Sequence, residues 1–116
     1  MPRRALVTGA TGFIGGRLAR ELAAGGWEVR CLARDTSRAA ALHDRRIELR
    51  QGDVLDADSL RGAGAGVEVA YYLVHAMGRG GGGDFEERER RGALNFAEMA
   101  KREGVGRVVY LGGLGD

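Results

Sequence analysis

Three glycines near the start of the chain have the spacing of a turn that binds phosphate groups. They belong to the run Thr8-Gly9-Ala10-Thr11-Gly12-Phe13-Ile14-Gly15-Gly16, which follows a short apolar stretch and opens a helical pattern. In such a turn Gly9 permits the sharp change of direction, Gly12 lets the backbone approach a pyrophosphate, and Gly15 lets the helix pack closely on a sheet. A glycine-rich turn that holds no ligand is the alternative. The position between a strand pattern and a helix pattern favours the anion site.

The start of that helix would supply the hydrogen-bond donors. The N–H groups around Gly12, Phe13 and Ile14 are expected to face the anion, helped by the helix dipole. The predicted ligand is therefore a dinucleotide whose pyrophosphate lies at this turn.

Arg34 could select which dinucleotide binds. It lies 19 positions after Gly15, close to the ~20 at which an acidic residue binds the ribose 2′-OH of NAD. A guanidinium there favours a 2′-phosphate, because its paired N–H groups match phosphate geometry. We therefore expect NADP ahead of NAD. Two alternatives stay open: Asp35 follows immediately and could bind the ribose of NAD, or Arg34 is a solvated loop residue.

Short apolar runs alternate with helical patterns along the chain, which predicts a parallel sheet covered by helices on both faces. Strands are predicted at 5–7, 28–33, 47–50, 67–74 and 107–111, and helical segments at about 13–24, 35–43, 56–60 and 84–103. Connections between parallel strands are right-handed. The expected fold class is α/β, a doubly wound Rossmann-type parallel sheet with strand order 3-2-1-4-5.

The first helix has a clear apolar repeat. Ile14, Leu18 and Leu22 recur every four residues, so we expect them on one inward face. Gly25-Gly26 should end this helix.

The later helical segments also carry end signals and face patterns. Asp56 should cap the segment 56–60, and Gly104 should end the segment 84–103. In that last helix, the residues expected to face inward are Ala93, Phe96, Ala97 and Ala100. Two ion pairs are expected on its outer face, Glu86–Arg90 and Glu87–Arg91.

Composition excludes several classes of protein. The 116 residues include 21 glycines and one proline with no collagen-like period, and the 18 basic residues are scattered among 16 acidic ones. Scattered charge argues against a nucleic-acid partner. No apolar run approaches the ~20 residues of a membrane span, so no membrane partner is expected and the expected location is cytoplasmic. Cys31 is the only cysteine, so we expect a buried thiol, no internal disulfide and no metal site.

The first motif resembles that of the short-chain dehydrogenase/reductase superfamily. Its G-x-x-G-x-x-G spacing, from Gly9 to Gly15, is typical of the extended and atypical branches. Four later segments agree, and they are Cys31-Leu32-Ala33-Arg34-Asp35, Gly52-Asp53-Val54, Tyr71-Tyr72-Leu73-Val74-His75 and Val108-Val109-Tyr110-Leu111-Gly112-Gly113. The combination is most similar to the atypical, NmrA-like NAD(P)-binding proteins, and it covers nearly all of the chain.

This resemblance implies a set of cofactor-binding residues. It places the adenosine ribose at the end of the second strand, adenine beside Asp53, and the end of the fourth strand over the cofactor. For Asp53, hydrogen bonding to backbone within its own turn is also open, and a lining role for His75 is favoured over catalysis. The implied cofactor-binding residues are Gly9, Thr11, Gly12, Phe13, Ile14, Gly15, Arg34, Asp53, Val54, Leu73, Val74 and His75.

The usual catalytic pair of the superfamily is absent from the chain. Its reductases usually carry Tyr-x-x-x-Lys, in which the tyrosine transfers a proton, but no lysine stands four positions after Tyr71, Tyr72 or Tyr110. Because family members are longer, we expect 1–116 to be the N-terminal part of an NAD(P)-binding Rossmann domain. The substrate-binding portion and the catalytic residues, which are unknown, would then lie beyond it. The fifth strand would be a bare apolar edge, so we expect self-association by pairing there with another chain, aggregation, or only marginal stability.

The predicted function is NAD(P) binding within a short-chain dehydrogenase-like oxidoreductase that acts on an unknown small-molecule substrate. A non-catalytic NAD(P)-binding redox sensor that acts through a protein partner is the alternative, since the absent catalytic pair permits it. The glycine-rich segment 78–83 could be a lid over the cofactor or only a connector.

Overall fold

The computed structural model describes residues 3–9, 12–39, 42, 44–73 and 82–110. Strands and helices alternate along these residues. In chain order the elements are β1 (Arg4–Thr8), α1 (Phe13–Ala24), β2 (Glu28–Ala33), the 3-10 helix η1 (Thr36–Ala39), β3 (Ile47–Gln51), the 3-10 helix η2 (Ala57–Leu60), β4 (Val69–Tyr72), α2 (Gly82–Arg102) and β5 (Arg107–Tyr110).

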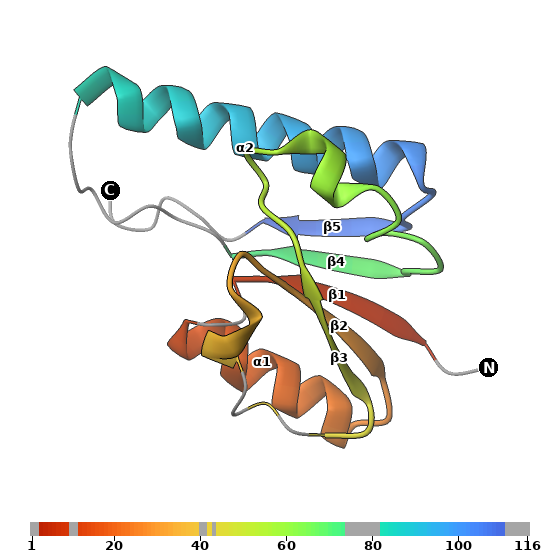
Figure 1. The fold of residues 1–116 in the computed structure, drawn as a ribbon. Helices are drawn as coiled ribbons and strands as arrows, with labels where there is room; N and C mark the ends of the chain where they lie inside the picture. Colours follow the sequence, from red (N-terminus) through yellow and green to blue (C-terminus); the bar gives the residue numbers. More distant parts are fainter. Residues whose placement is uncertain (1–2, 10–11, 40–41, 43, 74–81, 111–116) are drawn as a thin grey trace.

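The strands form one parallel sheet with the order β3-β2-β1-β4-β5, which confirms the predicted fold class. The central strand is β1, whose last residue Thr8 pairs with Leu32 of β2 and with Tyr72 of β4. Since all strands run the same way, their carboxyl ends meet at one edge of the sheet, on the left in Figure 1. The segments that leave β1, β2, β3 and β4 therefore begin side by side.

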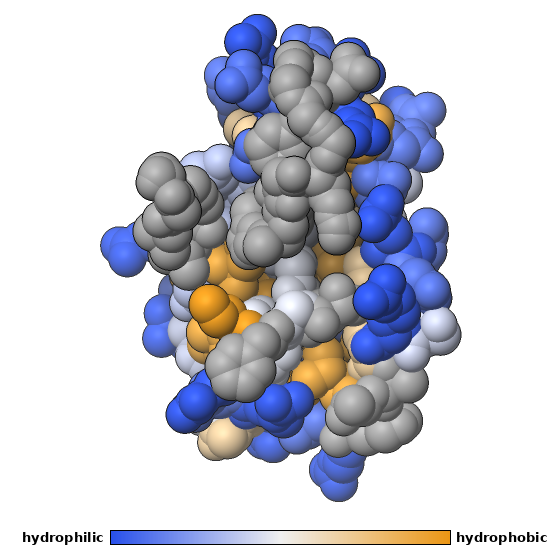
Figure 2. Space-filling model, turned by 90° about the vertical axis from the view of Figure 1, so that its left-hand side faces the viewer, coloured by the Kyte–Doolittle hydropathy of each residue, from blue (hydrophilic) through white to orange (hydrophobic). Residues whose placement is uncertain are grey.

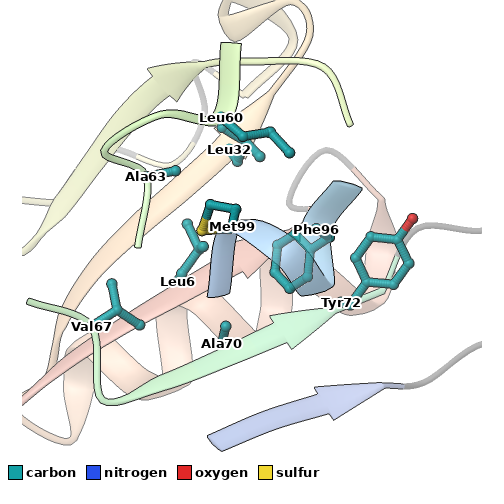
Figure 3. Packing of buried hydrophobic residues seen from close by; sticks show 9 residues of the cluster. All are labelled: Leu6, Leu32, Leu60, Ala63, Val67, Ala70, Tyr72, Phe96 and Met99. Carbon is teal, nitrogen blue, oxygen red and sulfur yellow. The ribbon is translucent and has the colours of Figure 1, made fainter. Parts of the chain in front are cut away.

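Helices cover the two faces of the sheet (Figure 1). Successive residues of a strand point to opposite faces, so Leu6 and Val7 of β1 belong to different buried clusters. On the α1 face the buried residues include Ala19, Ala23 and Cys31. The cluster beneath α2 and η2, shown in Figure 3, consists of Leu6, Leu32, Leu60, Ala63, Val67, Ala70, Tyr72, Phe96 and Met99.

Helix α1 has the predicted ends, and two of its three predicted inward residues pack on the sheet. The Gly25 N–H donates to the Glu21 carbonyl at 3.0 Å, as expected for a helix end. Leu18 and Leu22 are half-buried and pack against the cluster on this face, whereas Ile14 is 58% exposed. Ala19 and Ala23 are buried more deeply than either leucine. Small side chains let a helix approach a sheet closely, so Ala19 and Ala23 form the deepest part of the contact and the two leucines pack beside them.

Two short helical segments also differ from prediction. Of the described residues in the predicted helix 35–43, only Thr36–Ala39 are helical, as a 3-10 turn. Asp56 does precede η2, but its side chain makes no capping hydrogen bond. The Ser59 hydroxyl lies 2.7 Å from the Asp56 carbonyl and ties this turn together instead.

Helix α2 packs with one stripe and exposes the rest. Phe96 and Ala100 are buried as predicted, but Ala97 is exposed. The buried stripe continues through Met99, which turns Ala97 to the outer side. The predicted Glu87–Arg91 pair forms at 3.5 Å. Within the described ranges, no helix combines the length and the hydrophobicity needed to cross a membrane.

Candidate functional site

The turn that leaves β1 has the tight geometry its glycines predict. Gly9 has φ +102°, a conformation that other residues rarely adopt, and a Cβ there would lie 3.1 Å from the carbonyl carbon of Leu73. The Gly12 N–H donates to the Gly9 carbonyl at 3.1 Å, and the Leu73 N–H donates to the Thr8 carbonyl at 2.9 Å. The turn therefore lies directly against the segment that leaves β4.

The start of α1 leaves backbone donors without acceptors inside the helix. Its first intrahelical bond runs from the Gly16 N–H to the Gly12 carbonyl at 2.9 Å, so the N–H groups of Phe13, Ile14 and Gly15 have no intrahelical acceptor. No side chain caps this end, and no acidic residue stands in the first turn. The expectation that the Gly12 N–H is also free is wrong, because it closes the turn onto Gly9.

Two residues next to the glycine turn, Thr8 and Gly15, are buried. Gly15 is buried at the first turn of α1. Thr8 is only 3% exposed, and its hydroxyl has no hydrogen-bond partner among the described residues. A sharp glycine turn, unused helix donors and an unpaired hydroxyl together fit a group rich in hydrogen-bonding oxygens.

Arg34 and Asp35 follow β2 and differ in their local bonds. Asp35 Oδ1 accepts hydrogen bonds from the Ser37 hydroxyl at 2.6 Å and from the Ser37 N–H at 3.1 Å. These bonds, the hydroxyl foremost, lower the pKa of the Asp35 carboxyl. The Arg34 side chain is exposed, and within the described part of the chain its guanidinium enters no ion pair. The geometry therefore favours Arg34 over Asp35 as the group available to a ligand.

The segment after β3 shows the local role that was one of the two alternatives open for Asp53. The Leu55 N–H donates to Asp53 Oδ1 at 2.9 Å, and the Asp53 N–H donates to the Ser59 hydroxyl at 2.8 Å. Val54 packs against the cluster beneath α2. A contact between Asp53 and adenine stays a prediction.

Two residues of α2 support this segment, and no role was assigned to either from the sequence. Asn95 Nδ2 donates to the Val54 carbonyl at 2.7 Å. A Cβ on Gly92 would lie 2.8 Å from Val54 Cγ2 and 3.2 Å from the Tyr72 hydroxyl. The available signals were a glycine inside a long helix and an asparagine next to the buried Phe96.

The carboxyl edge of the sheet thus gathers most of the described candidate residues. Gly9, Arg34, Asp53 and Leu73 each stand just beyond a different strand, namely β1, β2, β3 and β4. Figure 2 views this edge and shows hydrophobic surface in its middle with hydrophilic residues along the sides. Thr11, Val74 and His75, together with residues 78–81 of the glycine-rich segment, lie outside the described residues.

A family model described as NAD(P)H-binding matches residues 9–116. The chain belongs to this NAD(P)H-binding family. The match begins at Gly9, in the glycine turn, and covers every element that follows β1.

Reductases and dehydrogenases are among the relatives of this NAD(P)H-binding chain. Sterol demethylase protein B of Methylococcus capsulatus is 38% identical over 112 residues, and cinnamoyl-CoA reductase 1 of Oryza sativa is 34% identical over 116 residues. These matches cover 95% and 94% of the chain but only 34% of each relative. The chain therefore spans about a third of the length of these relatives.

Solved structures show the same arrangement. Citrobacter sp. triphenylmethane reductase complexed with NADP(H) has a TM-score of 0.72 and 27% identity, covering 93% of this chain and 36% of that one. The NADPH-dependent quinone oxidoreductase QOR2 of Escherichia coli complexed with NADPH has a TM-score of 0.74 and 27% identity, covering 92% and 35%. The resemblance to atypical short-chain dehydrogenases/reductases is thereby confirmed.

Proposed function

We propose that the chain binds NADP at the carboxyl edge of the sheet and serves as the cofactor-binding part of a short-chain dehydrogenase-like reductase. The observation that carries this proposal is the turn from Gly9 to Gly12, which opens α1 with unused backbone donors. The pyrophosphate would accept hydrogen bonds from the N–H groups of Phe13 and Ile14, and the helix dipole would favour its negative charge.

The remaining candidate residues would hold the adenosine half. Arg34 has an exposed guanidinium just past β2, where it would pair with a ribose 2′-phosphate. Asp53 keeps one carboxylate oxygen on its own turn and would offer the other to the adenine amino group. Leu73, which lies against Gly9, would form part of the surface on which the cofactor rests. Support for NADP ahead of NAD comes from Arg34 and from the two solved relatives that hold NADP(H).

The reaction would be a hydride transfer, which the bound nicotinamide supplies. The sequence holds no Tyr-x-x-x-Lys pair, and the relatives are about three times as long as this chain. We therefore place the proton-transferring residues and the choice of substrate outside these 116 residues. No observation on the described residues favours the redox-sensor alternative, which stays a prediction.

Calorimetric titration with NADP tests the proposal, with two glycine variants as a matched pair. Gly9 and Gly26 both have positive φ, at +102° and +96°, but Gly26 lies at the far end of α1 with open space around it. We expect Gly9→Ala to lower NADP affinity at least about tenfold, and Gly26→Ala to strain the backbone with no loss of affinity. A wild-type chain that binds neither NADP nor NAD would overturn the proposal.

A further inference from the structure

The segment 52–55, which carries Asp53, is anchored at its start by two hydrogen bonds. The Gly52 N–H donates to the Ala33 carbonyl at 2.9 Å, and the Asp53 N–H donates to the Ser59 hydroxyl at 2.8 Å. These bonds fix where the segment leaves β3. The Asp53 carbonyl accepts from the Asp56 N–H at 2.8 Å and from the Ser59 hydroxyl at 2.9 Å, which closes a turn around Val54 and Leu55. A turn closed in this way exists with its central peptide group, here the one between Val54 and Leu55, in either of two orientations.

That peptide group is hydrogen-bonded on both of its sides. Its carbonyl, from Val54, accepts from Asn95 Nδ2 at 2.7 Å, and its N–H, from Leu55, donates to Asp53 Oδ1 at 2.9 Å. A peptide group is planar and rigid, so whatever fixes the direction of its carbonyl also fixes the direction of its N–H. Asn95 thereby sets the donor that holds the Asp53 carboxylate.

The surroundings of Asn95 explain why an amide stands there. Asparagine is a poor residue for a helix interior, and Asn95 is half-buried beside Phe96 on the stripe that packs on the sheet. Figure 3 shows Phe96 and Met99 pointing from this stripe into the buried cluster. A half-buried amide needs a hydrogen-bond partner, and the Val54 carbonyl provides it across 41 positions of sequence.

Helix α2 also holds the side chain of the same residue. Val54 packs against the cluster beneath α2, and Gly92 leaves so little space that a Cβ would lie 2.8 Å from Val54 Cγ2. Helix α2 therefore contacts Val54 twice, by packing against its side chain and by a hydrogen bond to its carbonyl. A peptide group held in this way has one orientation available, and so does the carboxylate bonded to it.

We propose that Asn95 is a positioning residue for adenine recognition. Through the Val54–Leu55 peptide group it orients the Asp53 carboxylate, whose other oxygen accepts the adenine amino group. This inference rests on the proposed function, because it takes Asp53 as the residue that contacts adenine. It adds a device on α2, far along the chain from the glycine turn, that makes the site selective for an adenine base.

Two dinucleotides that differ at the base test this role. The full chain is titrated with NADP and with its hypoxanthine analogue, which carries an oxygen in place of the amino group. The wild type should bind NADP about tenfold more tightly than the analogue, the effect of one hydrogen bond. Asn95→Ala, and the milder Asn95→Ser, should lower this ratio to about threefold or less, chiefly by weakening NADP.

Met99→Leu is the matched control, because it changes the same buried stripe one turn later at a side chain that makes none of the hydrogen bonds of segment 52–55. It should keep the wild-type ratio even where it lowers stability. A ratio that survives both Asn95 substitutions while NADP still binds overturns this inference and leaves the proposed function standing. If the wild type binds NADP and the analogue equally, Asp53 does not recognise the adenine amino group, and the inference is overturned. A wild type that binds neither dinucleotide overturns both proposals.

Discussion

The adjacent charged residues Arg34 and Asp35, which follow β2, make different contacts. Asp35 uses one carboxylate oxygen to hold both the N–H and the hydroxyl of Ser37, which shapes the turn into η1. The Arg34 carbonyl accepts a hydrogen bond from Gln51 Nε2 at 3.4 Å, and the Arg34 guanidinium is exposed. A turn that is fixed by its own residues presents Arg34 at a constant position, which favours specific recognition over a loose electrostatic attraction.

Replacing Arg34 with Gln should change which dinucleotide is preferred. Charge-assisted hydrogen bonds contribute about 1.5–3 kcal/mol, so NADP affinity should fall about ten- to a hundredfold while NAD affinity stays the same. Arg45→Gln removes an equal charge just before β3, at the amino ends of the strands, and should change neither the NADP affinity nor the NAD affinity. Both affinities can be measured by calorimetry. An equal loss for NADP and NAD would show that Arg34 does not contact the 2′-phosphate.

Cys31 should make stability depend on pH in the alkaline range. Burial raises the pKa of its thiol from 9.0 to about 12, so the folded chain keeps the proton that the unfolded chain loses above pH 9. Stability from this group is complete below that pH and is lost as pH rises toward 12. Between pH 8 and pH 10 the wild type should lose about 1 kcal/mol more than Cys31→Ala in urea unfolding. Equal losses would mean that the thiol ionises in the folded state.

The strands and the long helices could be predicted well from the sequence, because their patterns depend on local chemistry. The apolar run before Gly9 marks a buried strand by its composition, and the glycines that follow α1 and α2 mark helix ends by their backbone freedom. On α1, Leu18 and Leu22 pack on the sheet as predicted but Ile14 is exposed, and the deep burial of Ala19 and Ala23 was missed because it depends on how closely the helix approaches the sheet. The bond from Asn95 to Val54 could not be predicted either, because it depends on how α2 lies over a segment 41 positions earlier.

Gly92 is a position where α2 comes close to that segment. A methyl group there would meet Val54 Cγ2 at 2.8 Å and the Tyr72 hydroxyl at 3.2 Å, and overpacking of this kind costs about 1–3 kcal/mol. Alanine gains about 1 kcal/mol of helix propensity over glycine, so Gly92→Ala should be destabilising by about 1 kcal/mol in urea unfolding. The exposed Ala97, changed to Gly, measures the propensity alone on the same helix. A stabilised Gly92→Ala chain would show that α2 can move away without cost.

The two outer strands of the sheet, β3 and β5, differ in chemistry. At the β3 edge, Glu48 forms an ion pair with Arg30 of β2 at 3.2 Å, and charged edges discourage pairing with another chain. At the β5 edge, Val108 and Tyr110 are 44% and 54% exposed. An open groove of about 580 Å³ runs between β5 and α2, lined by apolar residues that include Leu94, Ala97 and Val108. Within the described residues this groove and this edge have no cover.

A chain of these 116 residues should therefore self-associate through β5. An apolar strand with unused N–H and C=O groups can pair with the same strand of a second copy, and that pairing would also shield the groove. Sedimentation velocity over a range of concentrations should show dimers or larger species for the wild type. Val109→Lys places a charge on the edge and should restore the monomer, whereas Leu55→Lys, at an exposed apolar residue away from β5, should not. A wild type that stays monomeric at every concentration would mean that the twist and shortness of β5 already prevent pairing.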